Sequence, residues 1–83
     1  MAAVRVRLFA SAREAAGAAQ VECAGVETIA DVLSELASRF GETFGAVVAA
    51  SRIWLNGDEP DKGEMTALRD GDEIAVLPPV SGG

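Results

Sequence analysis

The sequence ends with six residues whose types and order suggest chemistry. The terminal carboxylate of the last one is the most promising reactive group in the chain. The six residues are Pro78, Pro79, Val80, Ser81, Gly82 and Gly83. A free carboxylate is a poor electrophile, but its conversion to an acyl-adenylate creates a good leaving group, after which a sulfur or nitrogen nucleophile can attack the carbonyl. Because glycine has no side chain, a narrow tunnel that would exclude any Cβ could admit the end of the chain. We therefore predict a flexible tail whose carboxylate is activated by one partner protein and used inside another.

The position of the two glycines favours this interpretation over a frayed end, which is the ordinary fate of a terminal Gly-Gly. They closely follow Pro78 and Pro79, which stiffen the exit from the last predicted strand and give the tail a defined direction. Fully extended, residues 79–83 could reach roughly 17 Å. The prediction depends on this position and not on the glycines alone.

The rest of the chain offers little other chemistry. Histidine is absent, which removes the commonest general base and metal ligand. Cys23 is the only cysteine, so an intramolecular disulfide and a multi-cysteine zinc site are excluded, and its expected role is small apolar packing. We predict no metal site, no cofactor bound by this chain and no catalysis by the chain alone. Four acidic residues in one loop lack calcium-loop spacing and are typical of a solvated loop: Asp58, Glu59, Asp61 and Glu64.

Charge and hydropathy limit the partners. The 83 residues fit one small domain, and the 49% that are apolar suffice for a single core. The net charge of -6 argues against nucleic acid and favours a basic protein surface. The acidic turn at residues 70–73 could steer such a partner, although a solvated turn explains it equally well. Because no apolar run approaches the roughly 20 residues that span a bilayer, and no signal core is present, we expect a cytoplasmic protein without a membrane partner.

Hydrophobic alternation predicts the N-terminal elements. Within residues 4–9, the apolar side chains of Val4, Val6 and Leu8 share one face of a strand. Residues 11–17 are predicted to form a short helical turn, with Ser11 available as an N-cap and a glycine as its stop. A second short strand, antiparallel to the first, is predicted at residues 21–23.

The clearest predicted element is a helix over residues 29–40, which has a single apolar stripe. Thr28 can cap its first turn and Gly41 can terminate it. Residues 42–51 are rich in alanine and valine, and we predict a loop with a short helical piece that is interrupted at Gly45.

Two further strands are predicted at residues 52–56 and 73–77, each next to a turn signal. The polar connection at residues 60–68 is predicted to hold one short strand near Met65. The order strand, strand, helix, strand, strand predicts an α+β roll, in which a mixed sheet has one long helix packed across it.

Two apolar residues at strand ends are candidates for partner binding. Phe9 and Leu77 each lie one step out of phase with the core set of their strand, so both face the outer surface beside the tail exit if the first and last strands are neighbours. An apolar patch there would dock a partner, Leu77 more strongly than Phe9, unless loops cover it. Arg13 is a third candidate, because Arg13 and Glu14 could equally anchor an interface or pair with each other. Trp54 is expected to fill the core, whereas an exposed Trp54 would indicate a second contact surface.

Several motifs resemble those of a known family. The order of elements is similar to the β-grasp (ubiquitin-like) fold, and the Gly-Gly end is similar to that of its sulfur-carrier branch. This resemblance implies a β-grasp domain over residues 1–79 and a flexible sulfur-carrying tail over residues 80–83. More narrowly, the chain resembles the MoaD/ThiS-type small subunits of molybdopterin synthase in Leu8-Phe9-Ala10-Ser11-Ala12-Arg13-Glu14 followed by Gly17, and in Leu68-Arg69-Asp70-Gly71-Asp72-Glu73-Ile74 followed by Pro78-Pro79-Val80-Ser81-Gly82-Gly83.

The resemblance also implies a mechanism. An E1-like adenylating enzyme, of the ubiquitin-activating type, would use ATP and magnesium to adenylate Gly83. A sulfur donor protein would then leave a thiocarboxylate on that residue. The tail would enter the large subunit of molybdopterin synthase and donate sulfur to cyclic pyranopterin monophosphate during molybdenum cofactor biosynthesis. The chain would thus be a non-catalytic sulfur-donor subunit that works only in a complex.

Two other functions stay open. The chain could be a ubiquitin-like modifier, conjugated through Gly83 to lysine amines of target proteins. It could also carry sulfur for thiamine or cysteine synthesis. The patch around Phe9 and Arg13 favours molybdopterin synthase over the thiamine and cysteine pathways. The closer resemblance to sulfur carriers argues against the modifier, although some carriers of this fold perform both tasks.

Overall fold

A mixed sheet forms the centre of the molecule. The computed structural model describes residues 1–79, so the predicted tail at 80–83 lies outside the described part. The strands are β1 (Ala2–Leu8), β2 (Gln20–Val26), β3 (Arg52–Leu55) and β4 (Glu73–Leu77), in the order β2-β1-β4-β3 across a four-stranded sheet. The central β1 and β4 are parallel, and both outer pairs are antiparallel. The predicted α+β roll with a mixed sheet is confirmed.

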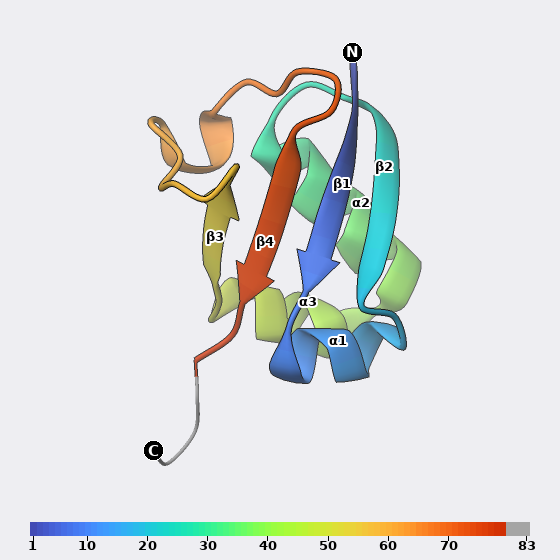
Figure 1. Cartoon of the computed structure of the whole chain (residues 1–83). Helices are drawn as coiled ribbons and strands as arrows, with labels where there is room; N and C mark the ends of the chain where they lie inside the picture. Colours follow the sequence, from blue (N-terminus) through green and yellow to red (C-terminus); the bar gives the residue numbers. More distant parts are fainter. Residues whose placement is uncertain (80–83) are drawn as a thin grey trace.

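The helices cover one face and one end of this sheet. They are α1 (Ala10–Ala16), α2 (Ile29–Phe40) and α3 (Glu42–Ala49), and the connection between β3 and β4 holds the short 3₁₀ helix η1 (Gly63–Met65). Figure 1 shows α2 crossing behind the sheet, while α1 and α3 lie across the end at which β1 and β4 finish. None of the helices among residues 1–79 has the length and apolar character that a membrane crossing requires.

Alternation in β1 builds the core. Buried and exposed residues alternate along the whole strand, so Val4, Val6 and Leu8 face α2 as predicted. From β4, Ile74 and Val76 join them, and both are fully buried. Because β1 and β4 lie at the middle of the sheet, these side chains form the centre of the hydrophobic core.

Local hydrogen bonds fix both ends of α2. The hydroxyl of Thr28 accepts the N–H of Asp31 at 3.3 Å, and the Asp31 carboxylate accepts the N–H of Thr28 at 3.2 Å, which together make a capping box. At the other end, Gly41 has a φ of 94° and donates its N–H to the carbonyl of Ala37 at 2.9 Å. The predicted bounds and caps of this helix are confirmed.

The prediction of a broken loop at residues 42–51 is wrong. Residues 42–49 form the continuous helix α3, with Gly45 inside it. Phe44 is fully buried and Val48 is 9% exposed, and these two residues lie one turn apart on the face that packs against the core. Their burial outweighs the cost of about 1 kcal/mol for a glycine inside a helix, because tertiary packing supplies most helical stability in proteins.

Two other local predictions are wrong. Helix α1 begins at Ala10 and not after a Ser11 cap, because the carbonyl of Phe9 already accepts the N–H groups of Ala12 at 3.0 Å and Arg13 at 3.4 Å. The segment near Met65 is the 3₁₀ helix η1 and not a strand. The backbone N–H of Lys62, just before this helix, donates to the hydroxyl of Thr66, just after it, at 2.9 Å.

Candidate functional site

The exit of the predicted tail lies at the end of β4. Pro78 follows the strand directly and is half-buried, and Pro79 is exposed. β4 is a central strand that runs parallel to β1, so the chain leaves the body where both strands finish. The remaining predicted site residues lie outside the described residues: Val80, Ser81, Gly82 and Gly83.

Leu77 and Phe9 lie on the outer face of the sheet beside this exit. Leu77 is the last residue of β4, half-buried and out of phase with the buried Ile74 and Val76. Phe9 follows the last residue of β1 and is 37% exposed. Its N–H donates to the Val76 carbonyl at 3.3 Å, which fixes it next to β4. The placement of these two residues depends on the first and last strands being neighbours in the sheet. This adjacency is confirmed.

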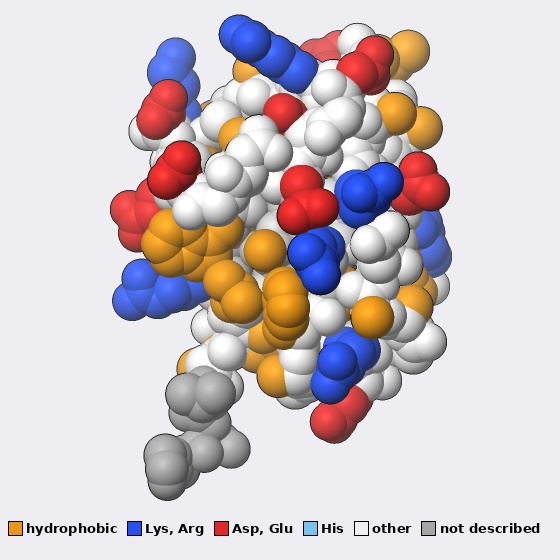
Figure 2. All heavy atoms as spheres, viewed as in Figure 1, with side chains coloured by type: hydrophobic (Ala, Val, Ile, Leu, Met, Phe, Trp, Pro, Cys, Tyr) orange, Lys and Arg blue, Asp and Glu red, His pale blue; other side chains and the backbone are white. Residues whose placement is uncertain are grey.

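Arginines surround this apolar surface. The Arg7 guanidinium lies 5.9 Å from the centroid of the Phe9 ring, which is within cation–π range. Arg5 and Arg7 also lie 4.0 and 3.8 Å from the carboxylate of Glu73, on the solvated face of the sheet. Figure 2 shows hydrophobic side chains gathered over β3 and β4 on this face, with basic side chains beside them. This face therefore carries charges of both signs around the apolar side chains.

Trp54 extends the same surface and corrects a prediction. Its neighbours in the sequence, Ile53 and Leu55, pack against the core, so the alternation of β3 places Trp54 on the outer face. There it is half-buried and lies opposite Ala75 of β4. It also lines a cleft of about 240 Å³ between β3 and the loop at residues 59–63. The expectation that Trp54 fills the core is wrong, because its side chain lies half-buried on the outer face. The contact surface named as the alternative stays a prediction.

Arg13 is exposed on α1, and its backbone N–H donates to the carbonyl of Phe9 at 3.4 Å. Within residues 1–79, it forms no ion pair with Glu14, which contradicts the pairing that the sequence left open. The Arg13 side chain is therefore exposed on the helix that follows Phe9. Its role there stays a prediction.

The acidic turn before β4 has a structural role. The carboxylate of Asp70 accepts the N–H of Ala3 at 2.8 Å. The Asp72 carboxylate accepts the N–H of Arg69 at 2.8 Å and the side-chain amide of Asn56 at 3.0 Å. Because this turn precedes β4 and the tail follows it, the two lie a strand length apart, about 17 Å. These carboxylates therefore hold the turn together, far from the tail exit.

Cys23 is a core residue, as predicted. Its side chain is 2% exposed. Burial, reinforced by the neighbouring carboxylate of Glu35, raises the pKa of the thiol from 9.0 to about 11, and Arg39 opposes this in part. The thiol therefore stays protonated at neutral pH and cannot act as a thiolate nucleophile. Among residues 1–79, no cluster of three or more histidine, cysteine or acidic side chains could hold a metal ion.

Comparison with known proteins places these features in context. The model of the ThiS family matches residues 6–83. The molybdopterin synthase sulfur carrier subunit of Anopheles gambiae is 34% identical over 96% of this chain and 93% of its own length. The solution structure of small archaeal modifier protein 1 from Methanosarcina acetivorans is 36% identical, covers 100% of this chain and 98% of its own, and has a TM-score of 0.87.

A third comparison concerns a complex. The subunit complex of the molybdopterin-converting factor from Helicobacter pylori 26695, described as a protein–protein complex of subunits 1 and 2, contains a chain that is 27% identical. That match covers 98% of this chain and 99% of the other, with a TM-score of 0.72.

Proposed function

Because this chain belongs to the ThiS family, we propose that it is the sulfur-carrier small subunit of molybdopterin synthase. The family and the fold establish the coarser statement that the chain is a β-grasp protein of the sulfur-carrier or archaeal-modifier type. Small carriers of this family are non-catalytic. The proposal adds the acceptor, cyclic pyranopterin monophosphate, and the residue that carries the sulfur, Gly83.

One observation carries the proposal. The central strand β4 ends at Leu77 on the outer face, with Phe9 beside it and Trp54 opposite Ala75, two residues before its end. The sequence continues from there through Pro78 and Pro79 to Gly83. A partner that docks on this face would therefore lie next to the start of the tail. The 34% identity to a named sulfur carrier subunit, over almost the whole chain, supports the same role.

The chemistry proposed at Gly83 has two stages. An E1-like adenylating enzyme uses ATP and magnesium to join AMP to the carboxylate, with release of pyrophosphate. The outer sulfur of a persulfide on a sulfur donor protein then attacks the carbonyl and AMP leaves, which joins the two proteins through an acyl disulfide. A second thiol of the partner breaks the S–S bond, forms a disulfide with the donor cysteine and releases the thiocarboxylate on Gly83. Acid–base groups come from the partners, since this chain contains no histidine and its buried Cys23 thiol is protonated at neutral pH.

The proposed acceptor complex contains the large subunit of molybdopterin synthase. The complex of the Helicobacter pylori relative supports a paired arrangement of this kind. In this chain, Phe9, Arg13 and Leu77 would bind the large subunit, and Trp54 would enlarge the contact. Apolar and aromatic anchors near the centre of an interface commonly carry most of its binding energy.

A second candidate function is protein modification through Gly83. The fold match to small archaeal modifier protein 1, with its TM-score of 0.87, favours it, and the 36% identity is similar to that of the sulfur-carrier relative. The two functions share adenylation of Gly83 and differ in the nucleophile. Sulfur attack gives the carrier, and attack by a lysine amine of a target protein gives the conjugate.

Intact mass spectrometry tests the proposal. The purified chain is incubated with ATP, magnesium, an adenylating enzyme and a sulfur source, and its mass should rise by the difference between sulfur and oxygen. A variant that lacks Gly83 is the control and should not change. A folded wild-type chain that keeps its mass would refute sulfur carriage. Adducts of higher mass, linked through lysine isopeptides, would favour the modifier, and molybdopterin formation after addition of the large subunit would identify the acceptor.

A further inference from the structure

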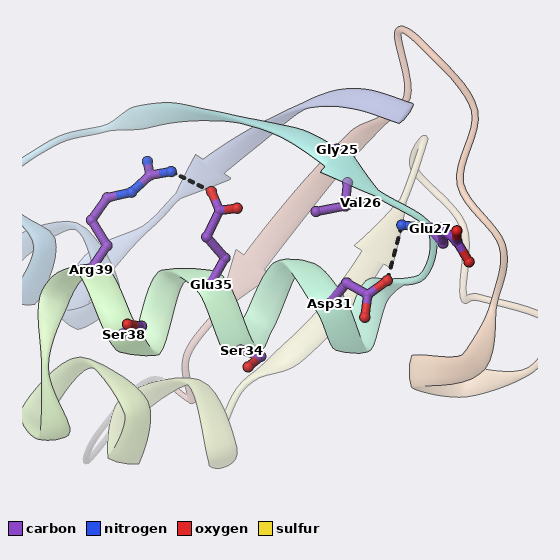
Figure 3. A pocket seen from close by; sticks show the side chains of 8 residues that line it. All are labelled: Gly25, Val26, Glu27, Asp31, Ser34, Glu35, Ser38 and Arg39. Atoms are coloured by element: carbon purple, nitrogen blue, oxygen red, sulfur yellow. Dashed lines mark hydrogen bonds and ion pairs between the residues drawn. The ribbon is translucent and has the colours of Figure 1, made fainter. Parts of the chain in front are cut away.

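A second surface lies at the opposite edge of the sheet from Trp54. Strand β2 is an edge strand, and a groove of about 590 Å³ separates it from α2. Figure 3 shows Glu35 and Arg39 rising from α2 toward β2, with Asp31 at the other end of the groove. The lining comes from the end of β2 and from one side of α2: Gly25, Val26, Glu27, Asp31, Ser34, Glu35, Ser38 and Arg39.

The backbone of β2 presents hydrogen-bonding groups to this open edge. In β1, the N–H of Leu8 donates to the Ala19 carbonyl at 2.8 Å, whereas the N–H of Arg5 donates to Asp72 at 3.0 Å on the β4 side. The backbone N–H and C=O groups of successive residues point to alternate sides of a strand. Those of Arg5 therefore point to β4, and those of Glu22, which lies opposite Arg5 in β2, point away from β1. The N–H and C=O of Glu22 therefore point to the open edge, where another strand could pair with them.

A cation of the chain itself already occupies one end of the groove. Both terminal nitrogens of Arg39 donate to the carbonyl of Glu22 at 3.4 Å, and the same guanidinium forms an ion pair with Glu35. The edge carbonyl and the helix carboxylate thus bind a guanidinium together. These two acceptors therefore lie close enough together to share one guanidinium, which in this chain is that of Arg39.

The rest of the groove has unbalanced negative charge. Glu27, Asp31 and Glu35 line it, against the single cation of Arg39. Asp31 and Glu35 are four residues apart on α2, which is about 6 Å along the helix axis. Alternate residues of an extended strand are about 6.6 Å apart, so two basic side chains at alternate positions match this spacing.

We propose that the groove between β2 and α2 binds an extended segment of a partner protein, which pairs with the edge of β2 through its backbone and carries basic side chains at alternate positions. Backbone pairing supplies the geometry, and the carboxylates of α2 select the charge. This inference goes beyond the proposed function, because it uses neither Gly83 nor the outer face beside the tail exit.

A peptide titration tests the proposal. The probe is acetyl-Val-Arg-Val-Arg-Val-amide, added to the ¹⁵N-labelled full chain at low salt and followed by amide chemical shifts. The shifts should change along residues 20–26 and 31–39, and the N–H of Glu22 should become protected from exchange. The matching peptide with glutamate in place of arginine should bind at least about tenfold more weakly, the scale of losing one hydrogen bond to a charged group.

Two matched pairs of variants separate strand pairing from charge. Glu22→Pro and Glu22→Ala both remove the carboxylate, but only proline removes the edge N–H, which an edge strand tolerates. The proline variant should bind the arginine peptide about tenfold more weakly than the alanine variant. Ser34→Lys should weaken binding and Ser34→Glu should strengthen it, while the thermal midpoints confirm that all four variants fold.

Three results would overturn the inference. The first is a set of shift changes confined to the outer face near Phe9 and Leu77. The second is equal affinity for the arginine and glutamate peptides. The third is equal binding by folded Glu22→Pro and Glu22→Ala, which would show that no strand pairs with β2. Deletion of Gly83 should leave the titration unchanged, so this test and the test of sulfur carriage give independent answers.

Discussion

Alkaline pH should destabilise this fold through Cys23. The thiol is 2% exposed, and burial together with the carboxylate of Glu35 raises its pKa from 9.0 to about 11. Between these values the unfolded chain releases the proton while the folded chain retains it. Because the folded state binds more protons in this window, the free energy of unfolding must fall as the pH rises through it.

The size of the effect follows from the two pKa values. A difference of about 2 corresponds to about 2.7 kcal/mol, because each pKa unit is worth about 1.36 kcal/mol. The contribution is fully present below pH 9 and is lost by about pH 11. For a domain of this size such a loss is a large fraction of a total stability of about 5 kcal/mol.

The assay is urea unfolding at several pH values from 8 to 11, followed by the fluorescence of Trp54, with Cys23→Ala as the control. Any pH dependence that does not involve Cys23 is shared by both proteins and cancels in the difference. At pH 8 the variant should be less stable, since it leaves a small cavity. Toward pH 11 the difference should shift by about 2–3 kcal/mol in favour of the variant, enough to reverse its sign. Parallel pH curves would refute the reasoning and would mean that the Cys23 thiol is accessible to ionisation.

Three further predictions concern the core, a helix cap and the docking face. Leu36→Ala should lower the free energy of unfolding by about 2–5 kcal/mol in urea titrations, because the side chain is fully buried, and a loss below 1 kcal/mol would contradict its place in the core. Thr28→Ala should cost about 1 kcal/mol through loss of the capping box, whereas Thr28→Ser should cost much less in the same assay. Leu77→Asp should leave the thermal midpoint nearly unchanged and weaken binding to the large subunit of molybdopterin synthase about tenfold by calorimetry, and unchanged affinity would remove Leu77 from the interface.

The elements that could be predicted from the sequence are those whose signals are local. The alternation of β1 and the capping residues of α2 depend on neighbours within one turn or one strand, and both were confirmed. Helix α3 was not predicted because its stability comes from the burial of Phe44 and Val48 against distant elements. Judged by helix propensity alone, Gly45 predicts a break in the helix. Propensity is a weak guide wherever tertiary packing decides.

The positions of the surfaces could not all be predicted from neighbouring residues, because they depend on how the strands pair in the sheet. The outer position of Trp54 follows from the phase of β3, which only its pairing with β4 reveals. The groove beside β2 requires the strand order, because nothing in residues 20–26 marks that strand as an edge. The placement of Phe9 and Leu77 could be predicted, since it needed only the adjacency of the first and last strands.

The tail exit lies at the end of the central strand β4, whereas the groove lies at the β2 edge of the sheet, and this separation has a functional consequence. A carrier whose tail serves first an activating enzyme and then an acceptor must present the same exit to both, so partners that dock beside Leu77 exclude one another. A segment bound between β2 and α2 would not compete for that exit, because β1 separates β2 from β4. If the groove binds as proposed, one partner could stay bound to the chain while the tail passes from the activating enzyme to the acceptor. A partner held at the groove should then bind with the same affinity whether the outer face is free or occupied.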